Sequence, residues 1–365
     1  MAGRNLSEGW EAPDSQNLHP FEFNGNTKDY FGIWIVNVLL GLVTLSLYSS
    51  WAKVRNKKYF YGHTAVDGHN FDYHATGKQL FLGRLIVIAA LSVLVIAQLI
   101  SPALYLLVLL VLAIILPEII VRALRFNARV TSHRNVRFNF MGEFGDAFIT
   151  YLLIPIANVF SLYLCTPFVS RAANRFAINN HSYGDRKFKF DADIGAYYRP
   201  FLIALFIGIF LTFVLFGSLM GEFGALIQSG SNADMQEQQM MMFKIILATY
   251  AVMFLAIVPV IIYYKAVIRN VTFNNTILDD LHRFESTVNP LRYLWIVLTN
   301  VLAAITSIGL LVPWGRVRLA KYMAACTKLI AGGPLDSYSS GVSETSGVIA
   351  SEYMDMEGFD VGIGF

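Results

Sequence analysis

The sequence contains little charge and little cysteine. Only 15% of its 365 residues are Asp, Glu, Lys or Arg, whereas 55% are hydrophobic and the mean hydropathy is +0.51. Soluble domains carry about 25% charged residues, so the chain has too little polar surface for several soluble domains and is expected to be a membrane protein. The two cysteines, Cys165 and Cys326, are far apart, which excludes a disulfide framework and a cysteine metal motif.

The sequence also lacks the motifs that usually carry catalysis. HExxH, GxSxG, the P-loop and GxGxxG do not occur in a fitting context, and no pair of acidic residues lies within an apolar run. His63, His69 and His74 crowd one segment, but their spacing matches no common metal site. We therefore predict that the protein is not an enzyme and has no catalytic residue, metal or cofactor.

Six uncharged apolar runs divide the chain. A helix that spans a membrane needs about 20 apolar residues. The second run is long enough for two spans, because Ser101 and Pro102 mark a turn near its middle, so the sequence predicts seven membrane segments. The runs are 31–50, 85–117, 147–170, 200–221, 245–264 and 293–315.

The polar ends of the chain predict the domain boundaries. Residues 1–20 are polar and are expected to be disordered. Residues 331–365 are rich in Gly and Ser and contain acids but no base, which is typical of a mobile acidic tail. The remainder, 21–330, is predicted to be a single membrane domain.

A short pattern recurs within this domain. Pro or Ser is followed eight residues later by a basic and then an aromatic residue, and this happens four times, from Ser50, Pro117, Pro167 and Pro313. Alternating aromatic residues around a Gly, Asp or Asn turn follow most copies, which is typical of a β-hairpin. The predicted fold is an all-α polytopic bundle of tandem repeats, with short cytoplasmic hairpin arms. The predicted arms are 55–75, 122–141, 171–191 and 268–286.

The hairpin arms are expected to join. Isolated two-stranded hairpins are marginally stable in water. Four hairpins of one pattern on one face should therefore pack into a sheet-like or layered cap. The aromatic side chains of Phe71, Phe138 and Phe188 are expected to be buried in it.

Two segments resemble a known family. FEFNGNTKDYFGIWIVN (21–37) and SWAKVRNKKYFYGHTAVDGHNFDYHATG (50–77) are similar to the YjgN family of bacterial inner-membrane proteins, whose function is unknown. The resemblance extends from about Phe21 to Lys328. It implies a bacterial inner-membrane location and a polytopic helical fold, but no substrate or catalytic residue. Genes of this family often lie near one for a membrane zinc metallopeptidase, which makes such a peptidase an expected partner.

The distribution of Lys and Arg predicts the topology. If all seven segments cross the membrane, 14 of these residues lie on one side and 12 on the other. If 31–50, 147–170 and 291–315 re-enter instead, 26 share one face and none lies on the opposite face. The positive-inside rule favours the second arrangement, with all arms and the C-terminus in the cytoplasm. Full crossing stays open as the alternative, because each of the three segments has at least 20 residues.

Two groups of side chains are candidates for function. Basic residues at the helix ends are expected to bind anionic lipids or a protein partner, whereas nucleic acid is not expected at a net charge of only +3. Polar residues in the apolar runs are suited to line a solute path or to join helices by hydrogen bonds. We therefore predict a scaffold or lipid-organising protein, with an uncoupled channel or facilitator as the alternative. The basic candidates are Lys53, Arg55, Lys58, Arg122, Arg125, Arg171, Arg175, Arg316, Arg318 and Lys321, and the polar candidates are Asn37, Thr44, Ser161, Asn300 and Ser307.

Overall fold

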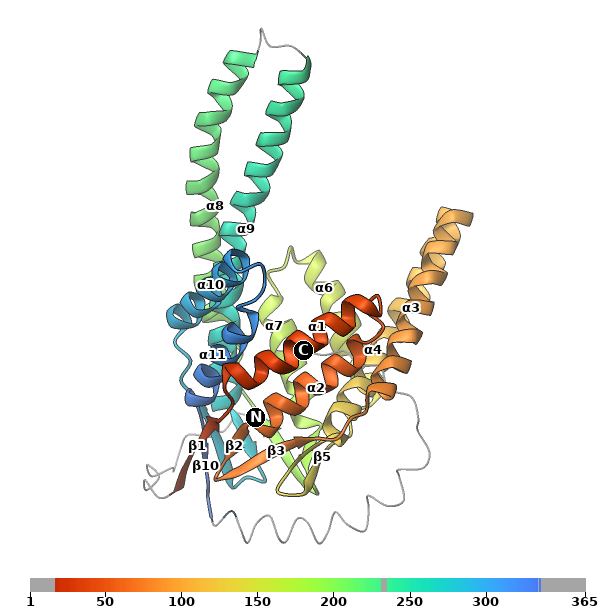
Figure 1. Ribbon diagram of the computed structural model, residues 1–365, viewed down its shortest axis with the longest axis vertical. Helices are drawn as coiled ribbons and strands as arrows, with labels where there is room; N and C mark the ends of the chain where they lie inside the picture. The colour runs from red at the N-terminus through yellow and green to blue at the C-terminus, as the bar shows by residue number, and fades with distance from the viewer. Residues whose placement is uncertain (1–16, 231–234, 334, 336–365) are drawn as a thin grey trace.

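The computed structural model describes residues 17–230, 235–333 and 335 (Figure 1). Most of the predicted disordered N-terminus and of the predicted acidic tail lies outside them. The strands are β1 (Leu18–Phe23), β2 (Thr64–Val66), β3 (His69–Tyr73), β4 (Thr131–His133), β5 (Val136–Phe140), β6 (His181–Tyr183), β7 (Arg186–Phe190), β8 (Thr276–Leu278), β9 (His282–Ser286) and β10 (Thr327–Ile330). The helices are α1 (Thr27–Val43), α2 (Ser49–Gly62), α3 (Gly77–Ile100), α4 (Pro102–Arg129), α5 (Phe144–Phe148), the π-helical turn η2 (Ile149–Leu153), α6 (Ile154–Phe160), α7 (Thr166–Asn179), α8 (Gly195–Gly230), α9 (Met235–Asn274), α10 (Pro290–Thr306) and α11 (Val312–Ala325).

The strands form one closed antiparallel barrel. Consecutive strands are neighbours from β2 to β10, and β1, the first in the chain, pairs with both β2 and β10. Four hairpins therefore stand side by side, and the two ends of the described chain supply the fifth pair of strands. The predicted all-α bundle with short hairpin arms is wrong, because the arms join edge to edge in a barrel that leaves no open sheet edge.

Strand length and chain distance explain this error. The strands contain only three to six residues, so each hairpin looks like a small appendage beside the long apolar runs. β1 and β10 lie at opposite ends of the described chain, so no local pattern predicts their pairing. In the closed barrel, each short hairpin pairs with further strands on both sides, which an isolated hairpin lacks.

Phenylalanines at matching positions of the odd-numbered strands fill the barrel. Phe71 lies opposite His133, and Phe138 lies opposite Tyr183, on the neighbouring strands. The ring centroids of successive phenylalanines are 6.1 to 6.5 Å apart, although a strand separates each pair, so these side chains converge on the inner face of the barrel. Three of them, which were expected to be buried in a joint cap, are half-buried. The five phenylalanines are Phe21, Phe71, Phe138, Phe188 and Phe284.

Helices surround one end of the barrel in a closed ring of pairs. The order helix, helix, strand, strand recurs along the chain, with α5, η2 and α6 together in the place of one helix. Neighbouring pairs contact one another where α2 meets α3, α4 meets α5, α7 meets α8, α9 meets α10 and α11 meets α1. A buried apolar cluster lies at each of these five seams. Both ends of every helix pair therefore lie at the barrel.

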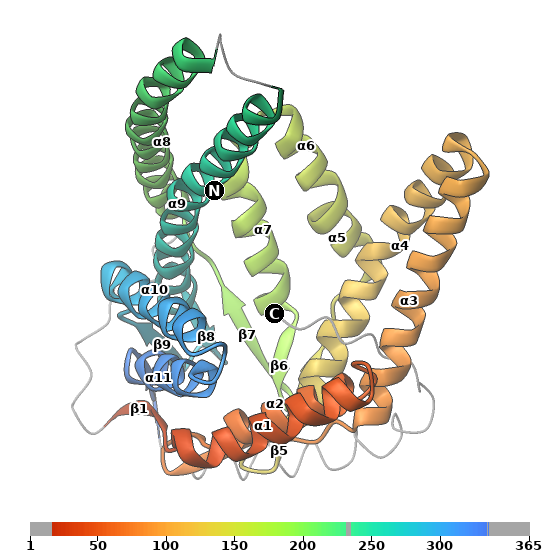
Figure 2. The same ribbon diagram turned by 45° about the horizontal axis from the view of Figure 1, so that its top comes forward.

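The helix pairs differ in length. Four helices of the described chain are long and apolar enough to cross a membrane, namely Gly77–Ile100, Pro102–Arg129, Gly195–Gly217 and Met242–Asn274. They belong to the pairs α3–α4 and α8–α9, which extend farthest from the strands and stand apart from each other in both views (Figures 1 and 2). The runs 31–50, 147–170 and 293–315 instead each contain a turn between two shorter helices.

Candidate functional site

The second helix of each pair ends in the same hydrogen bond. A side chain two residues after the helix bonds to the backbone carbonyl four residues earlier, at 2.6 to 2.8 Å. Helix ends leave such carbonyls without partners, so this bond satisfies a group close to the barrel. It explains why a Thr, or the chemically similar donor of a His ring, recurs at this place. The residues are Thr64, Thr131, His181, Thr276 and Thr327.

A buried aromatic residue, Tyr59, Phe176 or Tyr322, lies near the end of the second helix in each of the three short pairs and directly follows a basic residue. Tyr59 donates a hydrogen bond to the carbonyl of Asn26 at 2.7 Å and accepts one from its amide at 2.9 Å. Tyr322 makes the same two bonds to Asn289, at 3.1 and 2.9 Å. Successive helix residues are rotated by about 100°, so the residue before a buried aromatic points elsewhere. Lys58, before Tyr59, is accordingly exposed.

The predicted basic residues divide into two sets. Some are used within the protein, since Arg125 donates to the Gly142 carbonyl at 3.2 Å and Arg171 to the Ala192 carbonyl at 2.6 Å. The structure therefore does not bring all ten together in one patch, but distributes them over the second helices of four pairs. Half-buried are Lys53, Arg125, Arg171 and Arg318; exposed are Arg55, Lys58, Arg122, Arg175, Arg316 and Lys321.

Three of the predicted polar residues form the turn inside each short pair. The hydroxyls of Thr44, Ser161 and Ser307 each donate to a carbonyl of the preceding helix and accept from the amide four residues later, at 2.9 to 3.1 Å. Asn37 and Asn300 bond across to the second helix of their pair, at 3.2 and 2.9 Å. The two asparagines thus join the helices of a pair, whereas the three hydroxyls bond within the turn; the solute path stays a prediction.

The turns between the short helices are strained and apolar. Two consecutive residues in each turn have positive φ, although most of them are not glycine. Their tips are nearly free of protein contact: Leu45 is 89% exposed, Leu162 83% and Ile308 94%. Apolar side chains this exposed on a membrane protein are suited to lipid. These three hydroxyl residues were among the polar candidates predicted from the sequence, but it was not predicted that they close the turns.

Two of these turns, in the pairs α1–α2 and α6–α7, are hydrogen-bonded to the adjacent long helices, which fixes their positions along those helices. Arg84 of α3 donates to the Ser46 carbonyl at 2.9 Å, and Tyr198 of α8 donates to the Leu164 carbonyl at 3.3 Å. Arg84 is seven residues beyond Gly77 and Tyr198 three beyond Gly195, which correspond to about 10 and about 5 Å along a helix. The short pairs therefore reach only the first turns of the adjacent long helices.

An ionic network lies at the turns of the barrel. His19 of β1 lies 2.8 Å from a carboxylate oxygen of Asp67, which also pairs with Arg134 of the β4–β5 turn. Nearby, burial lowers the pKa of His133 to about 4. This network ties β1 to two hairpins. Among the described residues, no group of three or more His, Cys, Asp or Glu side chains is placed to hold a metal ion.

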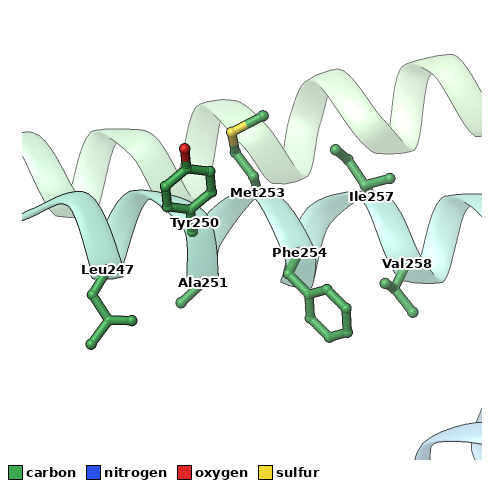
Figure 3. Close-up of a pocket in the computed structure, with 7 residues that line it drawn as sticks. All are labelled: Leu247, Tyr250, Ala251, Met253, Phe254, Ile257 and Val258. Carbon is green, nitrogen blue, oxygen red and sulfur yellow. The ribbon is translucent and has the colours of Figure 1, made fainter. Parts of the chain in front are cut away.

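A shallow groove on α9 is lined by apolar side chains. Its seven residues follow one stretch of the helix, where Leu247, Ala251, Phe254 and Val258 point away from the neighbouring helix (Figure 3). The lining contains no ionisable group other than the tyrosine phenol of Tyr250. Its composition suits lipid chains or another apolar helix and offers no constellation for catalysis.

The chain is similar to bacterial proteins of unknown function. A family model described as "Bacterial protein of unknown function (DUF898)" matches residues 18–356. The inner membrane protein YjgN of Salmonella typhimurium is 26% identical over 360 residues, which cover 87% of this chain and 90% of that protein. YjgN of Escherichia coli K12 is 24% identical over 361 residues, which cover 87% and 89%. No solved structure matches the chain. These similarities confirm the resemblance drawn from the two sequence segments.

Proposed function

This chain belongs to the DUF898 family of bacterial proteins, and from that premise we propose that it is a non-enzymatic membrane platform that binds anionic lipid headgroups. The observation that carries this proposal is the set of short helix pairs with apolar tips, which stand beside basic helix ends on a filled barrel. Its relatives are inner membrane proteins, and its four long apolar helices fit membrane insertion.

The closed barrel favours a topology in which all hairpin arms lie on the same side of the membrane. Each helix pair starts and ends at the barrel, so a pair that crosses the membrane must return to the side from which it left. Seven single crossings would put hairpins of one barrel on opposite sides of the bilayer. The basic arms then share one side, which the positive-inside rule assigns to the cytoplasm.

The three short pairs insert into one leaflet in this arrangement. The hydrocarbon core is about 30 Å thick, whereas the two pinned turns lie only about 5 to 10 Å along the adjacent long helices. The exposed tips Leu45, Leu162 and Ile308 would then contact acyl chains. This supports re-entrant segments that occupy the cytoplasmic leaflet without crossing it.

Exposed bases follow these inserted turns along each second helix. Lys58, Arg175 and Lys321 occupy the same place, directly before a buried aromatic residue, and are all exposed. No ion pair with a carboxylate of the described residues occupies any of the three. A base near the headgroups contributes about 1 kcal/mol to attraction for anionic lipid, so the three together contribute about 3 kcal/mol by that rule.

The barrel interior favours a platform over a channel. Five phenylalanines converge in it, with three successive pairs stacked and the fourth tilted. Val66, Tyr183, Leu278 and His133 lie at the same level, and the His133 ring packs against Phe71 at 4.6 Å. A water-filled path needs polar lining or a gap, and close-packed aromatic rings supply neither. The interior packing therefore disfavours solute passage along the barrel axis.

A lipid-binding assay tests the proposal. The full-length protein in detergent is titrated with phosphatidylglycerol and, separately, with phosphatidylcholine, and the shift in melting temperature reports binding. Lys58→Gln/Arg175→Gln/Lys321→Gln should lose most of the stabilisation by phosphatidylglycerol. The control, Arg186→Gln/Lys189→Gln, removes two bases that are already paired with carboxylates and should retain it. Equal stabilisation of both variants, or solute flux in proteoliposomes, would contradict the proposal.

A further inference from the structure

Two arginines from different helix pairs converge on the turn between α1 and α2. Arg84 of α3 donates to the Ser46 carbonyl at 2.9 Å and also to the Ser49 hydroxyl. Arg55 of α2 donates to the hydroxyl of Tyr48 at 3.2 Å. Both arginines are exposed, and both reach the same four-residue stretch, 46–49. Two positive charges therefore lie beside one apolar, membrane-facing turn.

No protein carboxylate balances these charges among the residues that the structure describes. Both bonds of Arg84 leave from the same nitrogen, Nη1, so its other N–H groups stay available. Arg84 also lies within a helix that is apolar enough to span a membrane. A charged side chain at such a position is costly unless it reaches a counter-ion or the interface. A bilayer supplies one anion at this depth, the lipid phosphate.

Aromatic rings form a wall beside the two arginines. Trp51 stacks on Tyr48 with ring centroids 6.1 Å apart and packs against Phe81 at 5.4 Å. Trp51 also lies directly against Gly77, where a Cβ atom would collide with the indole ring. Gly77 therefore lets α2 and α3 approach closely at this seam. Trp and Tyr are typical of the headgroup level of a membrane, which suits a site for a lipid headgroup.

We propose that Arg55 and Arg84, with the hydroxyls of Tyr48 and Ser49, bind the phosphate of an anionic phospholipid whose acyl chains lie along α3. The planar guanidinium group offers paired donors that match two phosphate oxygens. The apolar face of α3, with Leu85, Ile88 and Leu91 exposed, then receives the chains. This site rests on the proposed function and names one place where the headgroup is held.

Single and double substitutions in the full-length protein test the site. In detergent, the apparent Kd for phosphatidylglycerol should rise about fivefold for Arg55→Gln or Arg84→Gln and about 25-fold for both together. Arg186→Gln/Lys189→Gln, which removes two bases already paired with Asp279 and Asp280, should leave the Kd unchanged. Arg55→Gln leaves the bonds of Arg84 to the turn between α1 and α2 in place. A weaker affinity of this variant therefore cannot be explained by displacement of that turn. Arg84→Lys should bind more weakly than the wild type but more tightly than Arg84→Gln.

The outcomes separate this site from the general proposal. An unchanged Kd in the Arg55→Gln/Arg84→Gln protein would overturn the site, while a loss in the Lys58/Arg175/Lys321 variant would still uphold lipid binding. If neither variant loses affinity, both the site and the proposed function are wrong. Competition with millimolar inorganic phosphate distinguishes the source of the phosphate: no displacement supports a lipid, and full displacement overturns the lipid assignment.

Discussion

Removing one ring from the barrel should destabilise the whole protein. Phe138 stacks with Phe71 and Phe188, at 6.5 and 6.4 Å between centroids, and packs against Tyr183 at 5.2 Å. Truncation of a fully buried Phe to Ala costs about 3 to 5 kcal/mol, and aromatic pairs contribute about 0.5 to 1.5 kcal/mol each. Because Phe138 is half-buried but makes three aromatic contacts, we expect Phe138→Ala to cost about 3 kcal/mol by these rules.

The assay is thermal unfolding in detergent, followed by intrinsic fluorescence. A loss of 1 kcal/mol lowers the melting temperature by about 2 °C in a large domain, so Phe138→Ala should lower it by about 6 °C. Phe206→Ala is the matched control, because Phe206 is 72% exposed on α8 and faces detergent or lipid. If both variants melt at the same temperature, the phenylalanines do not form a cooperative core and the filled barrel is refuted.

Two further substitutions address the helix ends and the barrel turns. Tyr322→Phe removes both hydrogen bonds to Asn289 and should lower the free energy of unfolding by about 1 to 2 kcal/mol; a melting temperature equal to the wild type would contradict that role. The pKa of His133 lies near 4 in the folded protein and near 6.5 in the unfolded chain. Between these two pH values the unfolded chain binds the proton more readily than the folded protein does. The contribution of His133 to the free energy of unfolding should therefore be complete above pH 6.5 and fall as the pH drops from 6.5 to about 4. His133→Phe should lessen this fall when melting is measured across that range, and an unchanged pH profile would exclude His133 as its cause.

The local elements of the fold could be predicted because their signals are short-range. The turn residues and alternating aromatics of Phe138–Phe140 and Phe188–Phe190 indicate hairpins within a few residues of sequence. The resemblance to the YjgN family also came from contiguous segments. Barrel closure could not be predicted, since the strand that begins at Leu18 pairs with one that ends at Ile330.

The candidate site shows the same limit. The basic residues were recognised as an interfacial feature, but the contacts that divide them into exposed and structural sets come from other elements, as when Arg125 bonds to Gly142. Arg84 was not among the candidate residues. Its role depends on a turn 38 positions away in sequence, and only packing of α2 against α3 brings the two together.

Topology is the most direct test of the account, because everything proposed here needs all hairpins on one side. Single cysteines replace Asn70, Asn135, Lys187 and Asp280, which are exposed near the barrel turns, in a background with Cys165→Ser and Cys326→Ser. A fifth cysteine replaces Ser231, between the two longest helices. In intact cells, an impermeant thiol reagent that crosses only the outer membrane should label position 231 and none of the other four. Labelling of only the 187 and 280 positions, or only the 70 and 135 positions, would contradict the account and support seven crossings.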